Sequence, residues 1–362
     1  ENAYKDTVYW LNRLSERRSG QMQKVDLKSM TFAELQQFVE DLGEKKFRTT
    51  QLYQWMHQKM VKEFASMTNL SAAFRDKLGE QAALNGCTMV KRQISADGTN
   101  KFLMELSDGN KVESVLMKYH HGNSVCISTQ VGCRMGCRFC ASTVGGLNRS
   151  LTTGEMLEQI YEVQRITGER VSNVILMGIG EPLDNYENVV RFIRMISDER
   201  GLHISQRNIT LSTCGLVDGI YRLMKEDLTI TLAISLHAPN DVLRREMMPV
   251  ANRYSIAEIL KACREYVDHT GRRVTFEYSL VDGTNDSAEH AEELAALLHG
   301  LNCHVNLIPL NPVEGRMGER SKRTKVLEFQ KILESRHITA TIRREMGSDI
   351  DAACGQLRGK NI

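Results

Sequence analysis

The sequence has no hydrophobic run long enough to cross a membrane, since none approaches the roughly 18 apolar residues that a spanning helix needs. Its first residues, Glu-Asn-Ala-Tyr-Lys-Asp, have no apolar core of the kind found in secretory signal peptides. It has almost no net charge, with 47 basic and 45 acidic residues, so a nucleic-acid partner would require locally clustered basic residues. Internal repeats and low-complexity segments are absent. We therefore expect a globular cytoplasmic protein that does not enter a membrane.

The nine cysteines lack the even, regular spacing of a disulfide framework. With 362 residues, the chain can bury a core that needs no covalent staples. This favours a reducing compartment in which the thiols are free or bound to metal. Four cysteines fall in or beside predicted helices and strands, and we interpret them as small buried side chains: Cys87, Cys214, Cys263 and Cys303.

The first 118 residues are predicted to form three parts. Residues 1–25 contain apolar residues at helical spacing and could form a docking helix. Residues 26–87 are predicted to form a small helical domain, in which Thr31 starts the first helix. Basic residues surround its second helix, so the domain could bind RNA phosphates, although a solvated surface explains them equally well. Residues 88–118 are predicted to form a short antiparallel β extension.

From residue 119 to 362, strand-length apolar runs alternate with helix-length segments. Such alternation is typical of βα units with a parallel sheet. We predict an α/β fold, a partial (β/α)6 barrel, with these strands: Ser124–Ser128, Asn173–Met177, Asn208–Ser212, Ile230–Ser235, Val274–Ser279, Val305–Ile308 and Ile338–Ile342. The predicted helices are Thr153–Thr167, Tyr186–Asp198, Gly215–Met224, Ile256–His269, Ser287–Leu298 and Ser321–Ser335.

Three cysteines, Cys133, Cys137 and Cys140, have C-x3-C-x2-C spacing. Thiolates bind zinc, copper and iron–sulfur clusters, and structural zinc requires a fourth ligand. A [4Fe–4S] cluster held by three thiolates leaves one iron open. The spacing resembles the signature of the radical S-adenosylmethionine (SAM) enzymes, which implies a [4Fe–4S] cluster that binds and cleaves SAM. Unrelated thiols, or a zinc site completed by a remote cysteine or histidine, are the alternatives.

Polar or glycine-rich residues follow most of the predicted strands. In a βα barrel the reactive residues lie where strands end and βα loops begin. Each residue alone could be structural, but together they predict that one rim of the barrel carries the chemistry. The strand-end stretches are Gly178–Pro182, Ser212–Thr213, Ser235–His237 and Pro309–Pro312, and the last strand leads into Asp349–Gln356.

Two further cysteines are candidates for reactivity. Cys126 lies in the first predicted strand, and Cys354 lies in a loop near Arg343, Arg344 and Arg358. Positive charge favours the thiolate, which is the nucleophilic form of cysteine. The alternative is that both are unreactive thiols.

Read together, these stretches resemble the RlmN-type dual-specificity adenine C2 methyltransferases, which act on 23S rRNA and tRNA. The similarity covers roughly residues 26–362 and rests on the following segments: Cys126–Cys133, Cys137–Cys140, Met177–Leu183, Leu211–Thr213, Ile234–Asp241, Asn306–Pro312 and Asp349–Leu357. It implies that Cys133, Cys137 and Cys140 hold the cluster. It also implies that SAM is bound by seven residues at the rim of the barrel: Gly180, Glu181, Ser212, Ser235, Leu236, His237 and Asn311.

The resemblance also implies a ping-pong reaction that uses two SAM molecules. Cys354 would accept a methyl group from the first SAM, and a radical derived from the second would activate that group for addition to adenine C2. Cys126 would resolve the protein–RNA adduct by taking a proton and forming a disulfide with Cys354. Glu113 matches the family's proton acceptor. An electron donor such as flavodoxin or ferredoxin would reduce the cluster, and we expect a monomer.

Two other functions are compatible with parts of the sequence. A Cfr-type C8 adenine methyltransferase would share the cluster and the cysteine pair, but the segments containing Pro182 and Pro309 favour the C2 group. A non-catalytic protein that binds zinc and RNA is the alternative from another class.

Overall fold

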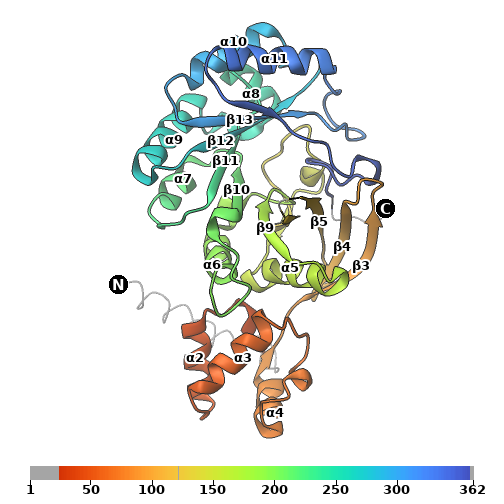
Figure 1. Ribbon diagram of the computed structural model, residues 1–362, viewed down its shortest axis with the longest axis vertical. Coiled ribbons are helices and arrows are strands. Elements are labelled where there is room, and N and C mark those ends of the chain that lie inside the picture. Colours follow the sequence, from red (N-terminus) through yellow and green to blue (C-terminus); the bar gives the residue numbers. More distant parts are fainter. Residues whose placement is uncertain (1–23, 121, 359–362) are drawn as a thin grey trace. The chain divides into compact units, whose positions relative to one another are not determined.

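The structure is a computed structural model that describes residues 24–120 and 122–358. These form two compact units, which meet in the sequence at Asn85 and Gly86 (Figure 1). The docking helix predicted within residues 1–25 falls on the first 23 residues, which lie outside the described part. No helix in the described ranges is both long enough and apolar enough to span a membrane.

The first unit is built from three α-helices within its described residues, α2 (Phe32–Asp41), α3 (Phe47–His57) and α4 (Ala72–Gln81). Thr31 starts α2 as predicted, because its side chain accepts from the Glu34 N–H and the Glu34 side chain accepts from the Thr31 N–H. Strands β1 (Val25–Asp26) and β2 (Ala82–Ala83) pair in parallel. The core of this unit consists of buried apolar side chains from all three helices, among them Leu35, Val39, Leu52, Met56, Phe74 and Leu78.

Within the described part of the second unit, ten strands form one sheet in the order β14-β13-β12-β11-β10-β9-β6-β5-β4-β3 (Figure 1). Their bounds are β3 (Cys87–Ile94), β4 (Asn100–Leu106), β5 (Lys111–Tyr119), β6 (Gly122–Cys126), β9 (Val171–Leu176), β10 (Ile209–Thr213), β11 (Thr231–Ser235), β12 (Val274–Leu280), β13 (Cys303–Pro309) and β14 (Ala340–Ile342). Strands β6 and β9–β14 are parallel, which confirms the predicted α/β class.

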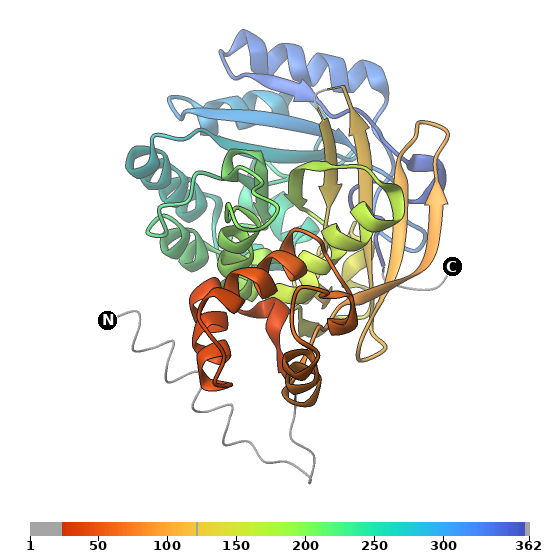
Figure 2. The same ribbon diagram turned by 60° about the horizontal axis from the view of Figure 1, so that its bottom comes forward.

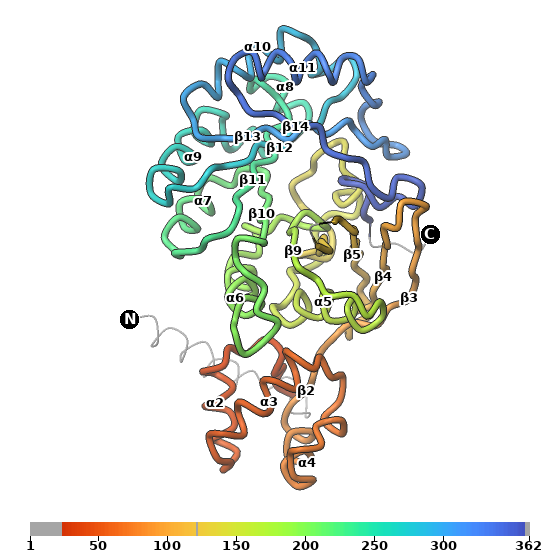
Figure 3. Tube along the Cα trace, viewed as in Figure 1, coloured from red at the N-terminus to blue at the C-terminus, as the bar shows by residue number. Residues whose placement is uncertain are grey.

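The antiparallel strands β3–β5 belong to this same sheet, because β5 pairs with β6 from Val115↔Cys126 to Tyr119↔Gly122. Strands β14 and β3 occupy the two ends of the sheet and do not pair with each other in the described ranges. The barrel is therefore partial. After β14, the C-terminal segment runs across to the turn between β3 and β4 (Figure 3).

Helices lie along the outer side of the parallel strands (Figure 2). They are α5 (Thr153–Thr167), α6 (Tyr186–Ile196), α7 (Val217–Leu223), α8 (Asp241–Met247), α9 (Ile256–Thr270), α10 (Ala288–Leu298) and α11 (Arg323–Ser335). Most match the predicted bounds closely, but α8 and the hairpin of β7 (Gln130–Gly132) and β8 (Leu147–Ser150) were not predicted. Both are short elements inside βα connections, where helical or strand periodicity has little length to develop.

Candidate active site

The three cysteines of the C-x3-C-x2-C motif lie on the loop between β7 and β8. The loop starts at Gly132, whose φ of +77° favours glycine. A Cβ atom at this position would lie 1.9 Å from the carbonyl oxygen of Gly146. That same oxygen accepts a hydrogen bond from the Cys133 N–H at 3.0 Å. The two ends of the loop are thus held against each other by backbone contact, which leaves no room for a side chain.

Arg316 holds the second half of the cysteine loop. Its guanidinium donates to the carbonyl oxygen of Cys137 at 3.0 Å and to that of Cys140 at 2.7 and 3.0 Å. It also donates to the Thr143 hydroxyl. Sequence reasoning missed Arg316, because an arginine that binds backbone carbonyls leaves no motif in an irregular loop.

Cys133, Cys137 and Cys140 line one cavity with about 930 Å³ of empty space. Burial raises the pKa of the Cys133 thiol to about 12, and it also raises the pKa of Cys137 and Cys140. Without a cation the three thiols are therefore protonated, whereas a bound metal would deprotonate them.

The geometry of these thiols bears on which metal they could hold. No group of three or more histidine, cysteine or acidic side chains in the described ranges converges on a point where one metal ion could sit. The three thiols nevertheless line one cavity, and three thiolates are the protein ligands of a [4Fe–4S] cluster that leaves one iron open.

Six of the seven predicted SAM-binding residues line this same cavity. They come from the carboxyl ends of β9, β10, β11 and β13, as the barrel rule predicts: Gly180, Glu181, Ser212, Ser235, His237 and Asn311. The seventh, Leu236, is fully buried and lies outside the cavity, with its N–H donating to the carbonyl oxygen of Glu277.

Glu181 is a buried carboxylate whose position is fixed by backbone donors. It accepts from the N–H of Cys214 at 2.8 Å and from the N–H of Leu183 at 3.0 Å. Burial raises its pKa. The preceding Gly180 has a φ of +110°, and a Cβ atom there would come within 2.7 Å of the Gln130 side chain. The turn therefore presents a carboxylate to the cavity, where it could accept hydrogen bonds from an ammonium group.

His237 is held as a neutral ring. Its Nδ1 accepts from the Ser279 N–H at 2.9 Å, so the proton resides on Nε2. Burial, together with the nearby Arg244, lowers its pKa to about 3. Arg244 is itself buried and donates to the carbonyl oxygens of Leu236, Tyr254 and Cys214. Arg244 thereby ties the loops after β10 and β11 together, a role that sequence reasoning missed.

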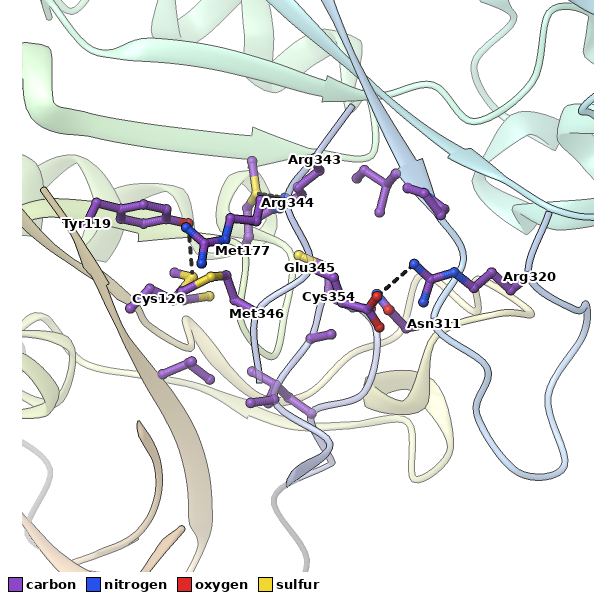
Figure 4. A pocket seen from close by; sticks show the side chains of 17 residues that line it. Tyr119, Cys126, Met177, Asn311, Arg320, Arg343, Arg344, Glu345, Met346 and Cys354 are labelled. Atoms are coloured by element: carbon purple, nitrogen blue, oxygen red, sulfur yellow. Dashed lines mark hydrogen bonds and ion pairs between the residues drawn. The ribbon is translucent and has the colours of Figure 1, made fainter. Parts of the chain in front are cut away.

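A second cavity, with about 600 Å³ of empty space, adjoins the first (Figure 4). Cys126, at the end of β6, and Cys354, on the C-terminal segment, both line it. The two cavities share five lining residues: Met177, Ile308, Asn311, Arg343 and Cys354. Cys354 therefore borders both the cavity of the C-x3-C-x2-C cysteines and the cavity that contains Cys126.

Arg343 lines the second cavity together with both thiols (Figure 4). The Coulomb interaction with Cys354 is the largest cause of a raised pKa for Arg343. Burial raises the pKa of Cys126 to about 12, and Arg343 opposes this shift. For Cys126 burial outweighs the nearby arginine and favours the thiol, contrary to what the arginines in the sequence suggested. The disulfide implied between Cys126 and Cys354 is absent from this structure, in which all nine cysteines, each within the described ranges, are free.

Glu113 lies apart from both cavities. Its carboxylate is buried, pairs with Lys101 at 2.9 Å and accepts from the Arg358 N–H at 2.6 Å. The structure therefore places this predicted proton acceptor beneath the C-terminal segment, and its assignment stays a prediction.

Two family models match this chain, one in each compact unit. Residues 25–84 match the family described as the ribosomal RNA large subunit methyltransferase N-terminal domain, and residues 127–298 match the radical SAM superfamily. Two curated relatives carry the name probable dual-specificity RNA methyltransferase RlmN. The protein from Lachnoclostridium phytofermentans is 58% identical over 337 residues, covering 93% of this chain and 95% of the relative. That from Lachnospira eligens is 60% identical over 336 residues, covering 92% and 96%.

A solved structure agrees with these relatives. The crystal structure of a radical SAM methyltransferase from Sphaerobacter thermophilus shares 44% identity and superposes with a TM-score of 0.90. The alignment covers 93% of this chain and 100% of that chain.

Proposed function

The chain belongs to the RlmN family of radical SAM RNA methyltransferases, and we propose that it methylates C2 of an adenine in 23S rRNA and in tRNA. In this proposal Cys354 carries the methyl group. The observation that supports it most strongly is that Cys354 lines both cavities. A methyl carrier must reach a donor on one side and an acceptor base on the other, and Cys354 is so placed.

Membership of this family implies a [4Fe–4S] cluster and SAM. We propose that Cys133, Cys137 and Cys140 hold the cluster, which leaves one iron without a protein ligand. When bound, the cluster and SAM supply a methyl donor and the radical that activates a methyl group, chemistry that protein side chains lack. Gly180, Glu181, Ser212, Ser235, His237 and Asn311 would position SAM in the same cavity.

Cys354 would accept the methyl group by direct displacement. Its thiolate, in the cavity that Arg343 also lines, forms a bond to the methyl carbon of SAM. The bond from that carbon to the sulfonium breaks, and its electron pair stays on the departing sulfur of S-adenosylhomocysteine. Because Cys354 also lines the second cavity, the methylated side chain would already face the substrate base.

The target adenine would enter the cavity lined by Cys126, Tyr119 and Arg343. A base in RNA must leave its stack to reach such a pocket. We propose that Cys126 takes the C2 proton of the adduct, whose unpaired electron would return to the cluster. The Cys126 sulfur, as a thiolate, then bonds to the Cys354 sulfur while the bond from that sulfur to the transferred carbon breaks. The electron pair of the broken bond stays on the carbon, which takes up a proton and leaves as the methyl group of the product. Burial raises the pKa of Cys126, so its thiolate is a strong base once formed. Glu113 remains a candidate proton acceptor for the same stage.

Three further assignments complete the proposal. A low-potential electron donor such as flavodoxin or ferredoxin would reduce the cluster. The helical unit, with Lys45, Lys46 and Arg48 at the start of α3, would bind RNA phosphates. The enzyme would act as a monomer in the cytoplasm.

The test is the position of the new methyl group. The anaerobically reconstituted enzyme is incubated with SAM, a reductant, and either a 23S rRNA fragment or tRNA, and the digested nucleosides are separated by mass spectrometry. We expect 2-methyladenosine from both RNAs, and none from the Cys354→Ala variant. Cys303→Ala is the matched control, because Cys303 lines neither cavity. 8-Methyladenosine would instead identify the Cfr-type activity, and unmodified RNA would refute the proposal.

A further inference from the structure

The segment that carries Cys354, residues 347–358, is held from two sides. We call it the Cys354 segment. On one side the turn between β3 and β4 contacts its start: the Gly347 N–H donates to Asp97 at 2.9 Å, and the Asp349 carboxylate accepts from the Ala96 N–H at 3.2 Å. The turn between β3 and β4 thus binds a segment some 250 residues away in the sequence.

On the other side the cysteine loop contacts the end of the Cys354 segment. The Ala141 N–H donates to the carbonyl oxygen of Gly355 at 2.7 Å, and the Ser142 hydroxyl donates to that of Leu357 at 2.8 Å. Apolar side chains of the segment, Met346 before it and Ala352 and Leu357 within it, pack against β5. Cys354 lies between these two sets of contacts.

A buried ion pair connects the strands to both flanks of Cys354. Lys101 on β4 and Glu113 on β5 pair at 2.9 Å, with side chains only 2% and 4% exposed. The Lys101 ammonium donates to the carbonyl oxygen of Asp351 at 3.0 Å. The Glu113 carboxylate accepts from the Arg358 N–H at 2.6 Å. Lys101 therefore binds the segment before Cys354, at Asp351, and Glu113 binds it after Cys354, at Arg358.

The contact at Asp351 falls on an unusual backbone conformation. Asp351 has a φ of +52°, a left-handed conformation that is costly for residues other than glycine and tolerated best by asparagine and aspartate. This residue redirects the chain toward Cys354, and Lys101 binds its carbonyl oxygen. Removing that donor would free the segment to leave the left-handed conformation.

We propose that Lys101 is a positioning residue for methyl transfer: paired with Glu113, it clamps the Cys354 segment so that the thiol faces the SAM cavity. The inference rests on the proposed role of Cys354 as the methyl carrier. Lys101 lines neither cavity, so it acts through the segment and touches neither SAM nor RNA.

The experiment must separate clamping from folding. Replacing Lys101 alone removes the ammonium group that pairs with the buried Glu113 carboxylate, and breaking a buried pair destabilises a protein whatever the function of the pair. The double variant Lys101→Met/Glu113→Leu removes both charges and keeps apolar volume, so it should fold. Lys111→Met is the matched control, because Lys111 forms a partly exposed pair with Glu105 on the same two strands.

Each reconstituted variant is incubated with SAM without RNA, so any proton-acceptor role of Glu113 toward the RNA adduct cannot affect the result. Methylation of Cys354 is followed by peptide mass spectrometry. Two readouts do not depend on methyl transfer: hydrogen exchange of residues 347–358, and cleavage of SAM to 5′-deoxyadenosine after reduction.

We expect the double variant to keep its cluster and SAM cleavage, to exchange faster in the Cys354 segment, and to methylate Cys354 slower by on the order of 100-fold, the scale of a small misplacement of reacting groups. Lys111→Met should match the parent in all readouts. If the double variant shows the parent's hydrogen exchange in residues 347–358, or the parent's rate of Cys354 methylation, Lys101 is not a positioning residue. If the parent itself leaves Cys354 unmethylated, the proposed function is wrong, and the inference falls with it.

Discussion

Replacing Gly180 by alanine should damage the SAM cavity through the backbone. The φ of +110° places Gly180 in the left-handed region, where a side chain costs about 1–2 kcal/mol. The new Cβ would lie 2.7 Å from Cβ and 2.8 Å from Cγ of Gln130, and such overpacking costs about 1–3 kcal/mol. We therefore expect Gly180→Ala to lower the free energy of unfolding by about 2–5 kcal/mol.

The displacement of Gln130 also has a functional consequence. Its Oε1 accepts from the Glu181 N–H at 2.9 Å, and its Nε2 donates to Asp184 at 3.0 Å. A shift of Gln130 should therefore move Glu181 and weaken SAM binding.

Urea denaturation of the cluster-free protein measures the loss of stability, and equilibrium binding to the reconstituted enzyme measures the loss of SAM affinity. Gly283→Ala is the control, because Gly283 has a φ of +68° and a Cβ atom there would meet no heavy atom within 4 Å. It should lose only about 1–2 kcal/mol and keep its SAM affinity. Equal losses in the two variants, with SAM affinity unchanged in both, would refute the reasoning.

Four further predictions test individual side chains. Cys354→Ala should abolish methyl transfer but keep SAM cleavage, and a loss of cluster absorbance would contradict this assignment. Cys126→Ala should accumulate a protein–RNA adduct on denaturing gels, whereas normal turnover would make Cys126 structural. Arg316→Gln should bind less iron and sulfide per chain after reconstitution, because the carbonyl oxygens of the cysteine loop lose their cation, and an unchanged cluster content would refute this role. His237 has a folded-state pKa of about 3 against an ordinary 6.5, so the unfolded chain takes up its proton first and stability falls as the pH falls from 6.5 toward 3. Between pH 7 and 5, His237→Gln should therefore lose about 2 kcal/mol less stability than the parent in urea denaturation, and equal losses would contradict a buried neutral ring.

Much of the parallel sheet could be predicted from local patterns. Helix α5 has the predicted bounds of Thr153–Thr167, since it combines an N-terminal capping box with a long apolar face. Polar residues after the strands also predicted one shared cavity, because the carboxyl ends of parallel strands meet at one rim. Leu236 is the exception: the same pattern included it, but the side chain is buried.

The long-range features were beyond local patterns. Pairing of β5 with β6 joins the antiparallel extension to the parallel strands, and only the fold reveals this register. Arg244 and Arg316 hold loops through backbone carbonyl oxygens, which carry no sequence signature. Lys101 reaches a segment 250 positions away. Interactions of this kind depend on tertiary proximity, so neither periodicity nor motif spacing predicts them.

The central claim is that Cys354 receives the methyl group before the RNA does. The most direct measurement incubates the reconstituted enzyme with SAM carrying an isotopically labelled methyl group, without RNA, and identifies the labelled peptide by mass spectrometry. We predict the label on Cys354, and its transfer to adenine when unlabelled SAM, reductant and RNA are added. Label on another residue, or an unlabelled protein that still methylates RNA, would contradict this claim.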